Sequence, residues 1–530
     1  MTGPAVGRRA AAWLVAVGLL AASCGTGTDT VEAPPLVTAA TPADDGSGSA
    51  GTPAVTADGT APGAALVEQV DCPDPLVAAD LACGIATVPL DPDDPTGPTT
   101  RISIATRAGA DPARTTPLVV LQGGPGGAST ELAAFFPRRD FPQIFVDQRG
   151  TGFAGPDTDC VELDDRLVAL FGLTSDEALE LEYGAYAECA ARLRSGPDTA
   201  SLIDHTDTAH HAADVVAVMA ALGHPRWAVY GVSYGTTIAL EVLRRAPEGL
   251  VGAVLDGVYP PDIDVDAGLA RSADRALAEL DTACAADDSC RALISDVDAT
   301  VAALMARFDA DPVRVELGAD ETSLGTPVEV VFDGTGLAVS VFRFFYDERL
   351  LRFVPGVLAG LDAADDATAR WFARISVEVT ASSVISNDEG TYFAVQCRDR
   401  LPLAGPLPTD VSAFARAVAA VPLADICGDW VDPPPATPAS PSEPVASDLP
   451  VLTLTGRFDP ITPPSYAEHV AATLERVTGI VRDGRGHGIW AVDECAGRLV
   501  DEFVADPLRT LDTSCADEPL PVDWTAPVRR

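Results

Sequence analysis

The chain has 530 residues, of which 47% are hydrophobic, and it carries a formal net charge of −43 at pH 7. Nucleic acids and anionic membrane surfaces are also negative, so this charge opposes binding to either one through electrostatics. The sequence contains no lysine, which excludes a Ser-Lys dyad, a Schiff base and a P-loop lysine. It also lacks an H-E-x-x-H motif and paired C-x-x-C clusters, so we expect neither a metal ion nor a cofactor.

The first 24 residues have the pattern of an export signal. Arg8 and Arg9 precede an apolar run of about 13 residues, which is shorter than the roughly 20 that span a membrane. The run ends in Leu-Ala-Ala-Ser-Cys, which resembles a bacterial lipoprotein box with Cys24 as the lipidated residue; a plain secretory signal is the alternative. Residues 25–68 are rich in Thr, Ala, Gly, Pro and Asp and are expected to be a disordered tether. We therefore expect an extracytoplasmic protein that is either lipid-anchored to the cell membrane or secreted.

The cysteines indicate disulfide bonds. If Cys24 is the anchor, ten of the 11 cysteines remain, an even number in an exported chain. Connectivity does not follow from sequence alone, but the cysteines lie in neighbouring pairs, so we expect local pairing. The expected pairs are Cys72 with Cys83, Cys160 with Cys189, Cys284 with Cys290, Cys397 with Cys427 and Cys495 with Cys515.

From about residue 69, strand-like apolar runs alternate with helical patterns. This alternation predicts a mostly parallel β-sheet covered by helices, with ligands at the carboxyl ends of the strands. We divide this part of the chain into a first core segment (69–262), an insertion (263–445) and a C-terminal core segment (446–530). The expected strands are 102–105, 118–121, 143–146, 227–230, 251–255, 451–455 and 477–481.

A glycine-rich loop, residues 122–127 (Gln-Gly-Gly-Pro-Gly-Gly), follows the expected strand 118–121. Glycines let the backbone approach a ligand closely, so N–H groups of this loop suit the stabilisation of a negative oxygen during attack on a carbonyl. A loop that only connects a strand to a helix is the alternative. A phosphate-binding loop is disfavoured, because neither the G-x-x-x-x-G-K-[ST] pattern nor a lysine occurs.

The segment 231–235 (Gly-Val-Ser-Tyr-Gly) lies between the apolar run 227–230 and a helical pattern that extends to Arg245. A G-x-S-x-G nucleophile elbow requires this strand-turn-helix context, and here Ser233 would be the nucleophile. The two glycines provide room at a strained turn where side chains would collide. An ordinary glycine-containing turn is the alternative.

A serine nucleophile needs a base, and the base needs an acid that orients it. Four of the six histidines precede Ser233, whereas the α/β-hydrolase order Ser…Asp/Glu…His places the base after it. Of the remaining two, His469 falls in an amphipathic helical pattern that is typical of a surface position. His487 lies in a glycine-rich loop directly after a strand, where a base is able to reach the elbow.

The acid is expected at the end of a buried strand. Asp459 follows the apolar run 451–455 and precedes His487, as the triad order requires. Asp256 also ends a strand-like run and is the structural rival, although an aspartate in a Leu-Asp-Gly turn commonly stabilises the turn itself. We therefore favour Asp459 as the acid.

The strand pattern stops between residues 263 and 445, where helical patterns dominate. A long insertion at this place is expected to be a mainly helical lid over the site. Two of its acidic residues, Glu389 and Asp399, are candidates for binding a substrate amino group; surface charges beside a disulfide are the alternative. The lid also contains aromatic residues that could line the substrate pocket, although we expect most of them to pack in a core: Phe342, Phe344, Phe345 and Tyr346.

Together these motifs resemble a known family, the secreted tripeptidyl aminopeptidases and prolyl aminopeptidases of actinobacteria, which have the α/β-hydrolase fold. One departure is Gln122, where prolyl aminopeptidases usually carry histidine; the backbone donors are unaffected. The resemblance rests on segments 123–126 (Gly-Gly-Pro-Gly), 146–152 (Val-Asp-Gln-Arg-Gly-Thr-Gly), 231–236 (Gly-Val-Ser-Tyr-Gly-Thr), 458–463 (Phe-Asp-Pro-Ile-Thr-Pro) and 486–488 (Gly-His-Gly).

The resemblance implies roles for individual residues. Ser233 would be the nucleophile, with Asp459 and His487 as its partners. Backbone N–H groups near Gly124 and Tyr234 would form an oxyanion hole. The segment around Arg149 resembles one that buttresses the oxyanion loop, which implies an architectural role for that arginine.

We therefore predict an exported serine exopeptidase with the α/β-hydrolase fold, an aminopeptidase of the tripeptidyl type that acts on peptides with free N-termini. The peptide specificity comes from the resemblance alone. Two alternatives stay open: an esterase or lipase that acts on acyl esters, and a non-catalytic lipoprotein that binds a ligand with a hydrolase-like fold.

Overall fold

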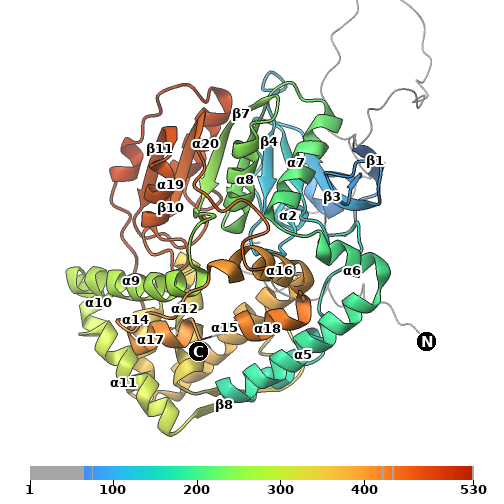
Figure 1. The fold of residues 1–530 in the computed structure, drawn as a ribbon. Coiled ribbons are helices and arrows are strands. Elements are labelled where there is room, and N and C mark those ends of the chain that lie inside the picture. The colour runs from blue at the N-terminus through green and yellow to red at the C-terminus, as the bar shows by residue number, and fades with distance from the viewer. Residues whose placement is uncertain (1–64, 75, 421–422, 432–434, 528–530) are drawn as a thin grey trace, which may run out of the picture.

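The computed structural model describes residues 65–74, 76–420, 423–431 and 435–527. The expected signal peptide with Cys24 and nearly all of the expected tether lie outside the described residues, so both stay predictions. The described chain forms two layers, an upper one built on a β-sheet and a lower one that is mainly helical (Figure 1). No helix in this part of the chain combines the length and the apolar character needed to cross a membrane.

The described residues form a core sheet of nine strands in the upper layer: β1 (Leu66–Val70), β2 (Ala82–Pro89), β3 (Thr99–Arg107), β4 (Leu118–Leu121), β5 (Gln143–Val146), β6 (Trp227–Val232), β7 (Leu250–Asp256), β10 (Ser447–Gly456) and β11 (Leu474–Arg482). Their spatial order is β1-β2-β3-β5-β4-β6-β7-β10-β11. β1, β2, β3 and β5 pair antiparallel, and all neighbours from β5 to β11 pair parallel. The predicted mostly parallel sheet is confirmed.

Helices cover both faces of this sheet. Along β4, Val119 packs in a cluster with α7 (Thr208–Leu222) and α8 (Tyr234–Arg245), whereas Val120 packs in a cluster with α20 (Glu494–Ala505). Successive residues of a strand point to opposite faces, so each central strand must be apolar throughout. This requirement explains why the central strands are continuous apolar runs in the sequence.

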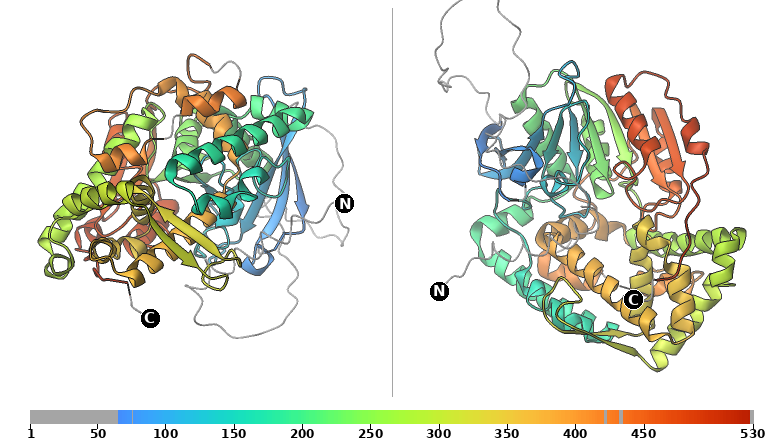
Figure 2. Two further views of the ribbon diagram at one scale, coloured as in Figure 1. Left: turned by 90° about the horizontal axis from the view of Figure 1, so that it is seen from below. Right: turned by 180° about the vertical axis from the view of Figure 1, so that it is seen from behind.

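The lower layer consists of helices and one hairpin, and it contacts the loops at the carboxyl ends of the parallel strands (Figures 1 and 2). For example, the His487 N–H, after β11, donates to the Tyr346 carbonyl of the lower layer at 3.0 Å. Its elements between residues 263 and 445 are α9 (Val265–Ala286), α10 (Asp288–Leu293), α11 (Val297–Ala310), β8 (Val313–Leu317), β9 (Val328–Phe332), α12 (Gly334–Phe344), α13 (Glu348–Leu351), α14 (Val354–Asp362), α15 (Asp366–Ile385), α16 (Glu389–Val395), the π-helical η2 (Gln396–Arg400), the 3-10 helix η3 (Leu401–Leu403), α17 (Ala413–Val418) and α18 (Leu423–Trp430).

A second segment of the chain joins this lower layer. It contains α3 (Val161–Asp164), α4 (Leu167–Phe171), α5 (Ser175–Ser195) and α6 (Pro197–Asp204). Helices α5 and α6 lie below the sheet in Figure 1. Leu193 of α5 packs in one buried cluster with Phe393 of α16 and Trp430 of α18. We therefore propose that the lid comprises residues 263–445 together with 161–204, a segment that the sequence analysis assigned to the first core segment.

Five disulfide bonds link the pairs that the sequence analysis expected: Cys72–Cys83, Cys160–Cys189, Cys284–Cys290, Cys397–Cys427 and Cys495–Cys515. The predicted local pairing is confirmed. Several disulfide bonds in one chain are typical of proteins that fold outside the reducing cytosol. They therefore indicate an extracytoplasmic protein.

Candidate active site

Ser233 lies at a sharp turn between β6 and α8. Its backbone has φ 57° and ψ −127°, a positive φ that non-glycine residues rarely adopt. A Cβ at Gly231 would lie 2.2 Å from the Gly235 carbonyl oxygen, and one at Gly235 would lie 2.3 Å from the Leu121 carbonyl oxygen. Only glycine fits at these two positions, so the turn has the geometry expected of a nucleophile elbow.

His487 and Asp459 meet at the carboxyl ends of β11 and β10. His487 Nδ1 lies 2.8 Å from Oδ2 of Asp459, whose side chain is fully buried. Oδ1 of Asp459 accepts the N–H groups of Ile461 at 3.0 Å and Thr462 at 2.8 Å. The Thr462 hydroxyl donates to Asp459 Oδ2 at 2.6 Å and lies 3.0 Å from His487 Nδ1. This arrangement favours the tautomer with the proton on Nδ1, which leaves Nε2 of His487 as a base.

The His487 ring lies close to the residues that fix the Ser233 turn. The Ser233 N–H donates to the Asp256 carbonyl at 3.0 Å, and a Cβ on the next residue, Gly257, would lie 3.1 Å from His487 Cε1. Within the described residues, no hydrogen bond joins the Ser233 hydroxyl to His487. Such catalytic bonds are often long before substrate binds, so this geometry is compatible with a base near the serine.

Asp256, the rival acid, supports the loop that carries His487. Its carboxylate accepts the N–H groups of Ile489 at 2.9 Å and Trp490 at 2.8 Å, and the Tyr230 hydroxyl at 2.9 Å. Among the described contacts there is no hydrogen bond between Asp256 and the His487 ring. The geometry therefore favours Asp459 as the partner of the imidazole.

Opposing effects set the pKa of His487. Burial lowers it, whereas the charge of Asp459, the hydrogen bond to Asp459 and the charge of Asp256 raise it, and the result is a pKa above the ordinary value. Burial raises the pKa of Asp256 to about 6. His487 is therefore protonated at mildly acidic pH and becomes a neutral base only as the pH rises.

The side-chain amide of Gln148 holds the glycine-rich loop in place. Its Nε2 donates to the carbonyls of Gln122 at 3.2 Å, Gly123 at 2.8 Å and Gly127 at 3.1 Å. Its Oε1 accepts the N–H group of Gly126 at 3.0 Å. One buried amide thus satisfies four backbone groups and fixes the curvature of the loop.

Two backbone donors near Ser233 remain free. Within the part of the chain that the structure describes, the N–H groups of Gly124 and Tyr234 donate no hydrogen bond. Tyr234 is the first residue of α8, where N–H groups have no partner inside the helix. A Cβ at Gly123 would lie 3.2 Å from Ser233 Oγ, so the glycine-rich loop passes beside the hydroxyl. Free donors beside a nucleophile are what an oxyanion hole requires.

The start of α16 lies on the glycine-rich loop. The Asp388 N–H donates to the Gly126 carbonyl at 3.0 Å, and Asn387 forms an antiparallel β-bridge with Gly127. Glu389 is the next residue along the chain. One of the two predicted amine-binding residues is therefore located beside the candidate oxyanion loop.

Glu389 is buried, and its Oε2 accepts the Cys160 N–H at 3.1 Å. Burial, followed by the charge of Asp159, raises the pKa of Glu389 to about 8, so its carboxyl group is mostly neutral at pH 7. Burial and then the charges of Glu182 and Glu389 raise the pKa of Tyr186 well above its ordinary value. Glu182 is thus a second carboxyl group near the same tyrosine, and the sequence analysis did not identify it.

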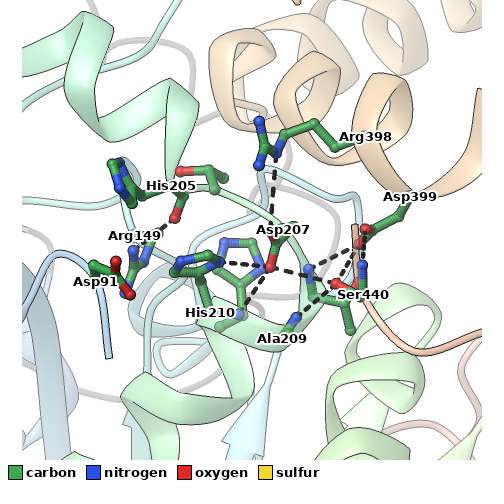
Figure 3. Close-up of polar contacts among 12 residues, drawn as sticks. Asp91, Arg149, His205, Asp207, Ala209, His210, Arg398, Asp399 and Ser440 are labelled. Carbon is green, nitrogen blue, oxygen red and sulfur yellow. Dashed lines mark hydrogen bonds and ion pairs between the residues drawn. The ribbon is translucent and has the colours of Figure 1, made fainter. Parts of the chain in front are cut away.

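Asp399, the other predicted amine-binding residue, is located in a different network (Figure 3). Its Oδ2 accepts the Thr208 N–H at 2.8 Å and the Ser440 hydroxyl at 3.0 Å, and its Oδ1 accepts the Ser440 N–H at 2.9 Å. These bonds join η2, the start of α7 and the proline-rich linker that returns from the lid. Because both oxygens already have partners, the arrangement favours an architectural role for Asp399.

Arg149 is buried, and Figure 3 shows its contact with His205. Its Nε and Nη2 donate to the two oxygens of Asp214 at 2.9 and 2.7 Å, and its Nη1 donates to the carbonyls of Leu90 at 2.7 Å and His205 at 2.6 Å. Nε, Nη1 and Nη2 of Arg149 all donate hydrogen bonds to protein acceptors. These contacts support the architectural role that the resemblance implies.

The roles of Thr462 and Gln148 were not predicted from the sequence. Both lie inside segments quoted for the resemblance, 458–463 and 146–152, but their contacts depend on how the loops fold back. Tyr346 packs against the lid core, and its ring centroid also lies 5.1 Å from that of the His487 ring, edge to face. The neighbouring aromatic residues pack in the lid core as predicted: Phe342, Phe344 and Phe345.

Protein-family models match two parts of the chain. A model described as "alpha/beta hydrolase fold" matches residues 116–293, and one described as "TAP-like protein" matches residues 412–515. The chain has the α/β-hydrolase fold. The first matched segment of this α/β-hydrolase contains Ser233, and the second contains Asp459 and His487.

Relatives of this α/β-hydrolase are named as peptidases. A proline iminopeptidase of Neisseria gonorrhoeae is 31% identical over 144 residues, which cover 27% of this chain and 33% of that protein. A tripeptidyl aminopeptidase of Streptomyces lividans is 28% identical over 201 residues, which cover 35% of this chain and 36% of that protein. The serine protease Hip1 of Mycobacterium tuberculosis is 25% identical over 476 residues, which cover 83% of this chain and 88% of that protein. The matches thus span about a third of the first two relatives and most of the third.

Proposed function

We propose that this α/β-hydrolase is an exported serine aminopeptidase of the tripeptidyl type that cleaves peptides near their free N-termini. Ser233, His487 and Asp459 would form its catalytic triad. The observation that carries the proposal is the 2.8 Å contact between His487 Nδ1 and Asp459 Oδ2, next to a serine held at a positive φ of 57°. The peptidase names of the relatives support a peptide substrate.

In the proposed reaction, the Ser233 hydroxyl attacks the scissile carbonyl while His487 Nε2 takes its proton. The Asp459 carboxylate stabilises the imidazolium that forms. The C–N bond then breaks as His487 returns the proton to the leaving amine, and the N-terminal fragment remains as an ester on Ser233. A water molecule, deprotonated by the same imidazole, hydrolyses this ester and restores the serine.

The N–H groups of Gly124 and Tyr234 would stabilise the negative oxygen of each tetrahedral intermediate. Both lack an acceptor in the described residues, so neither has to break a hydrogen bond when the oxyanion forms. The four hydrogen bonds of Gln148 would hold the Gly124 donor in position before substrate arrives. Such fixed donors are usually a large contribution to catalysis of acyl transfer.

Glu389 is our candidate for binding the substrate amino group. Its carboxyl group is mostly neutral in the free protein, because burial raises its pKa to about 8. A substrate ammonium group placed beside it would favour the charged form and lower that pKa, so Glu389 would ionise when substrate binds. Glu182 would add a second acceptor near Tyr186. This requirement for a free amine distinguishes an aminopeptidase from an esterase.

Covalent labelling tests the nucleophile. A fluorophosphonate probe is expected to label the wild-type protein and to leave Ser233→Ala unlabelled, because the probe reacts with an activated serine. Ser383→Ala, which changes an exposed lid serine, is the matched control and should be labelled like the wild type. An unlabelled wild type would support the non-catalytic alternative.

Substrate comparison tests the aminopeptidase assignment. A chromogenic tripeptide with a free N-terminus is expected to be hydrolysed, and its N-acetylated form to be hydrolysed about 100-fold more slowly, because a buried carboxyl group would lose its charged partner. Equal turnover of the two peptides, or turnover of short acyl esters alone, would instead support an esterase. A series of peptides that differ in length then determines how many residues are released.

The lipid anchor at Cys24 is part of the proposal and is tested separately. Wild-type protein expressed in a bacterium that processes lipoproteins should sediment with membranes, and Cys24→Ala should be soluble outside the cytoplasm. A soluble wild type would favour the plain secretory signal.

A further inference from the structure

Helix α9 of the lid holds the loop that carries the proposed acid. Arg275 of this helix donates from Nη2 to the Asp459 carbonyl at 2.5 Å and from Nη1 to the Arg457 carbonyl at 2.8 Å. Helix α9 lies in the insertion 263–445, whereas both carbonyls follow strand β10 of the core sheet. One lid side chain therefore binds the main chain of the proposed acid itself.

The N–H groups of the same loop bind the segment that leads to the proposed base. The Arg457 N–H donates to the Arg482 carbonyl at 2.9 Å, and the Phe458 N–H donates to the Arg485 carbonyl at 3.0 Å. Arg482 ends β11, and the chain continues through Arg485 to His487. The acid loop is thus fixed to the base loop through its N–H groups and to the lid through its carbonyls.

Packing alone does not give this loop its orientation. Phe458 is only 3% exposed and packs in the lid core cluster, which also contains Leu277 of α9. Such apolar contact determines how deeply the loop is buried, but it is not directional. Hydrogen bonds are directional, so the two bonds from Arg275 determine how the peptide groups on either side of Phe458 are oriented.

The two carbonyl contacts suit arginine in particular. A guanidinium presents its N–H donors in a rigid planar fork and is able to bind two acceptors at once, whereas the ammonium of lysine is a single point charge. Arg275 also forms an ion pair with Glu279, but at 4.0 Å this contact is too long for a hydrogen bond. Both side chains are partly exposed, so the pair is weak and the carbonyls are the stronger contacts.

The charge of Arg275 is also felt by the acid. Burial lowers the pKa of Arg275, whereas the charges of Asp459 and Glu279 raise it. The Asp459 side chain is fully buried, and burying an ionised carboxylate is costly without a nearby positive charge. Arg275 therefore contributes both an orienting contact and a compensating charge.

We propose that Arg275 is a positioning residue for the proposed triad, which fixes the Asp459 main chain from the lid and thereby keeps its carboxylate in contact with His487. It touches neither substrate nor the imidazole and acts through Asp459. The lid is then part of the scaffold that builds the triad, in addition to covering it. The effect on turnover rests on the proposed function, whereas the orientation of Asp459 does not.

Steady-state kinetics on a free-amine tripeptide test the effect on turnover. We expect kcat to fall about tenfold in Arg275→Gln while KM changes little, because the lost charged hydrogen bonds orient a group that acts in the transition state. Arg275→Lys keeps the charge but loses the fork, so it should recover only part of the loss. Full recovery in Arg275→Lys would overturn the proposal, because one ammonium cannot replace both contacts.

Two further variants are the controls. Arg271→Gln changes an exposed arginine one turn earlier on α9, which pairs with Asp410 at 3.5 Å. Glu279→Gln removes the ion pair of Arg275 and leaves both carbonyl contacts in place. Both controls should keep the kcat and KM of the wild type. An equal fall in kcat in either control, or a rise in KM without a fall in kcat in Arg275→Gln, would overturn the proposal, since Arg275 would then only fasten the lid.

Proton NMR of the full chain tests the orientation without turnover. A proton between His487 Nδ1 and the Asp459 carboxylate should resonate at low field, and His487→Ala assigns this signal by its loss. We expect the signal to be the same in Arg271→Gln and to shift or broaden in Arg275→Gln. An unchanged signal in Arg275→Gln, or no such signal in the wild type, would overturn the proposal. A wild type that shows the signal but cleaves no free-amine peptide would instead overturn the proposed function.

Discussion

The hydroxyl of Thr462 lies between two members of the proposed triad, 2.6 Å from Asp459 Oδ2 and 3.0 Å from His487 Nδ1. Thr462→Val removes this hydroxyl but keeps the backbone N–H that also binds Asp459. We expect kcat/KM to fall about tenfold, because one hydrogen bond that orients the carboxylate is lost. Steady-state kinetics on a free-amine tripeptide measure the change.

Thr455→Val is the matched control for this substitution. Thr455 is also buried and lies just before the same loop, but its hydroxyl has no hydrogen-bond partner among the described residues. Its replacement should leave kcat/KM nearly unchanged. Equal losses in the two variants would mean that Thr462 acts only through packing.

The raised pKa of His487 determines how activity depends on pH. The imidazole must be neutral to accept a proton. Because its pKa lies above the ordinary value of about 6.5, the neutral form predominates only at higher pH. We therefore expect kcat/KM to be low in acid and to rise as the pH passes through a value above about 6.5. A half-maximal point below that value would contradict the assignment of His487 as the base.

The buried carboxyl group of Glu389 predicts a proton release on binding. Its pKa of about 8 in the free protein leaves it mostly protonated at pH 7, and a substrate ammonium group should lower that pKa. A free-amine tripeptide that binds Ser233→Ala at pH 7 should thus release up to about one proton. Calorimetry in buffers with different ionisation enthalpies measures the number.

The double variant Ser233→Ala with Glu389→Gln provides the control. Glutamine keeps an oxygen that can accept the Cys160 N–H but has no proton to release. Binding should become weaker and the proton release should disappear. The same release in both proteins would show that another group titrates.

At the scale of elements, the glycine-rich loop depends on one side chain that lies outside it. Gln148→Met keeps a side chain of similar length and removes four hydrogen bonds to the loop. We expect kcat to fall about 100-fold while KM changes little, because the oxyanion donors act mainly in the transition state. A rise in KM with unchanged kcat would indicate instead that the loop binds substrate.

Local patterns in the sequence were sufficient to predict the strands around the site. The expected strands 118–121 and 143–146 coincide with β4 and β5, because turn residues bound these short, mostly apolar runs. The elbow was also predictable, since only glycine fits at Gly231 and Gly235. The contacts of Gln148 were not, because a side chain that folds back onto an earlier loop leaves no periodic signal.

At the scale of the whole molecule, we propose that the lid is assembled from two separate segments. The loss of strand pattern predicted the insertion 263–445. The segment 161–204 gave no such signal, because an amphipathic helix has the same pattern whether it packs on the sheet or on another helix. The buried cluster that joins Leu193, Phe393 and Trp430 forms only in the tertiary fold.

The disulfide bonds of the two layers should have similar effects on stability and different effects on substrate binding. Cys397–Cys427 closes a loop within the lid with a sequence separation of 30, and Cys495–Cys515 closes one in the core with a separation of 20. Loop entropy alone predicts a loss of about 3 to 4 kcal/mol in unfolding free energy when either bond is removed. Urea unfolding of the Cys397→Ala/Cys427→Ala and Cys495→Ala/Cys515→Ala variants measures these losses.

Only the lid variant should bind substrate less well. Cys397 follows α16, the helix that begins at Glu389 and lies on the glycine-rich loop, so removing its disulfide frees the segment that positions the proposed amine site. We expect KM for a free-amine tripeptide to rise about tenfold in that variant and to stay close to wild type in the core variant. Because the two variants lose similar stability, a general loosening of the fold would raise KM in both. An unchanged KM in the lid variant would instead show that α16 is held by its packing against Leu193 and Trp430 rather than by the disulfide bond.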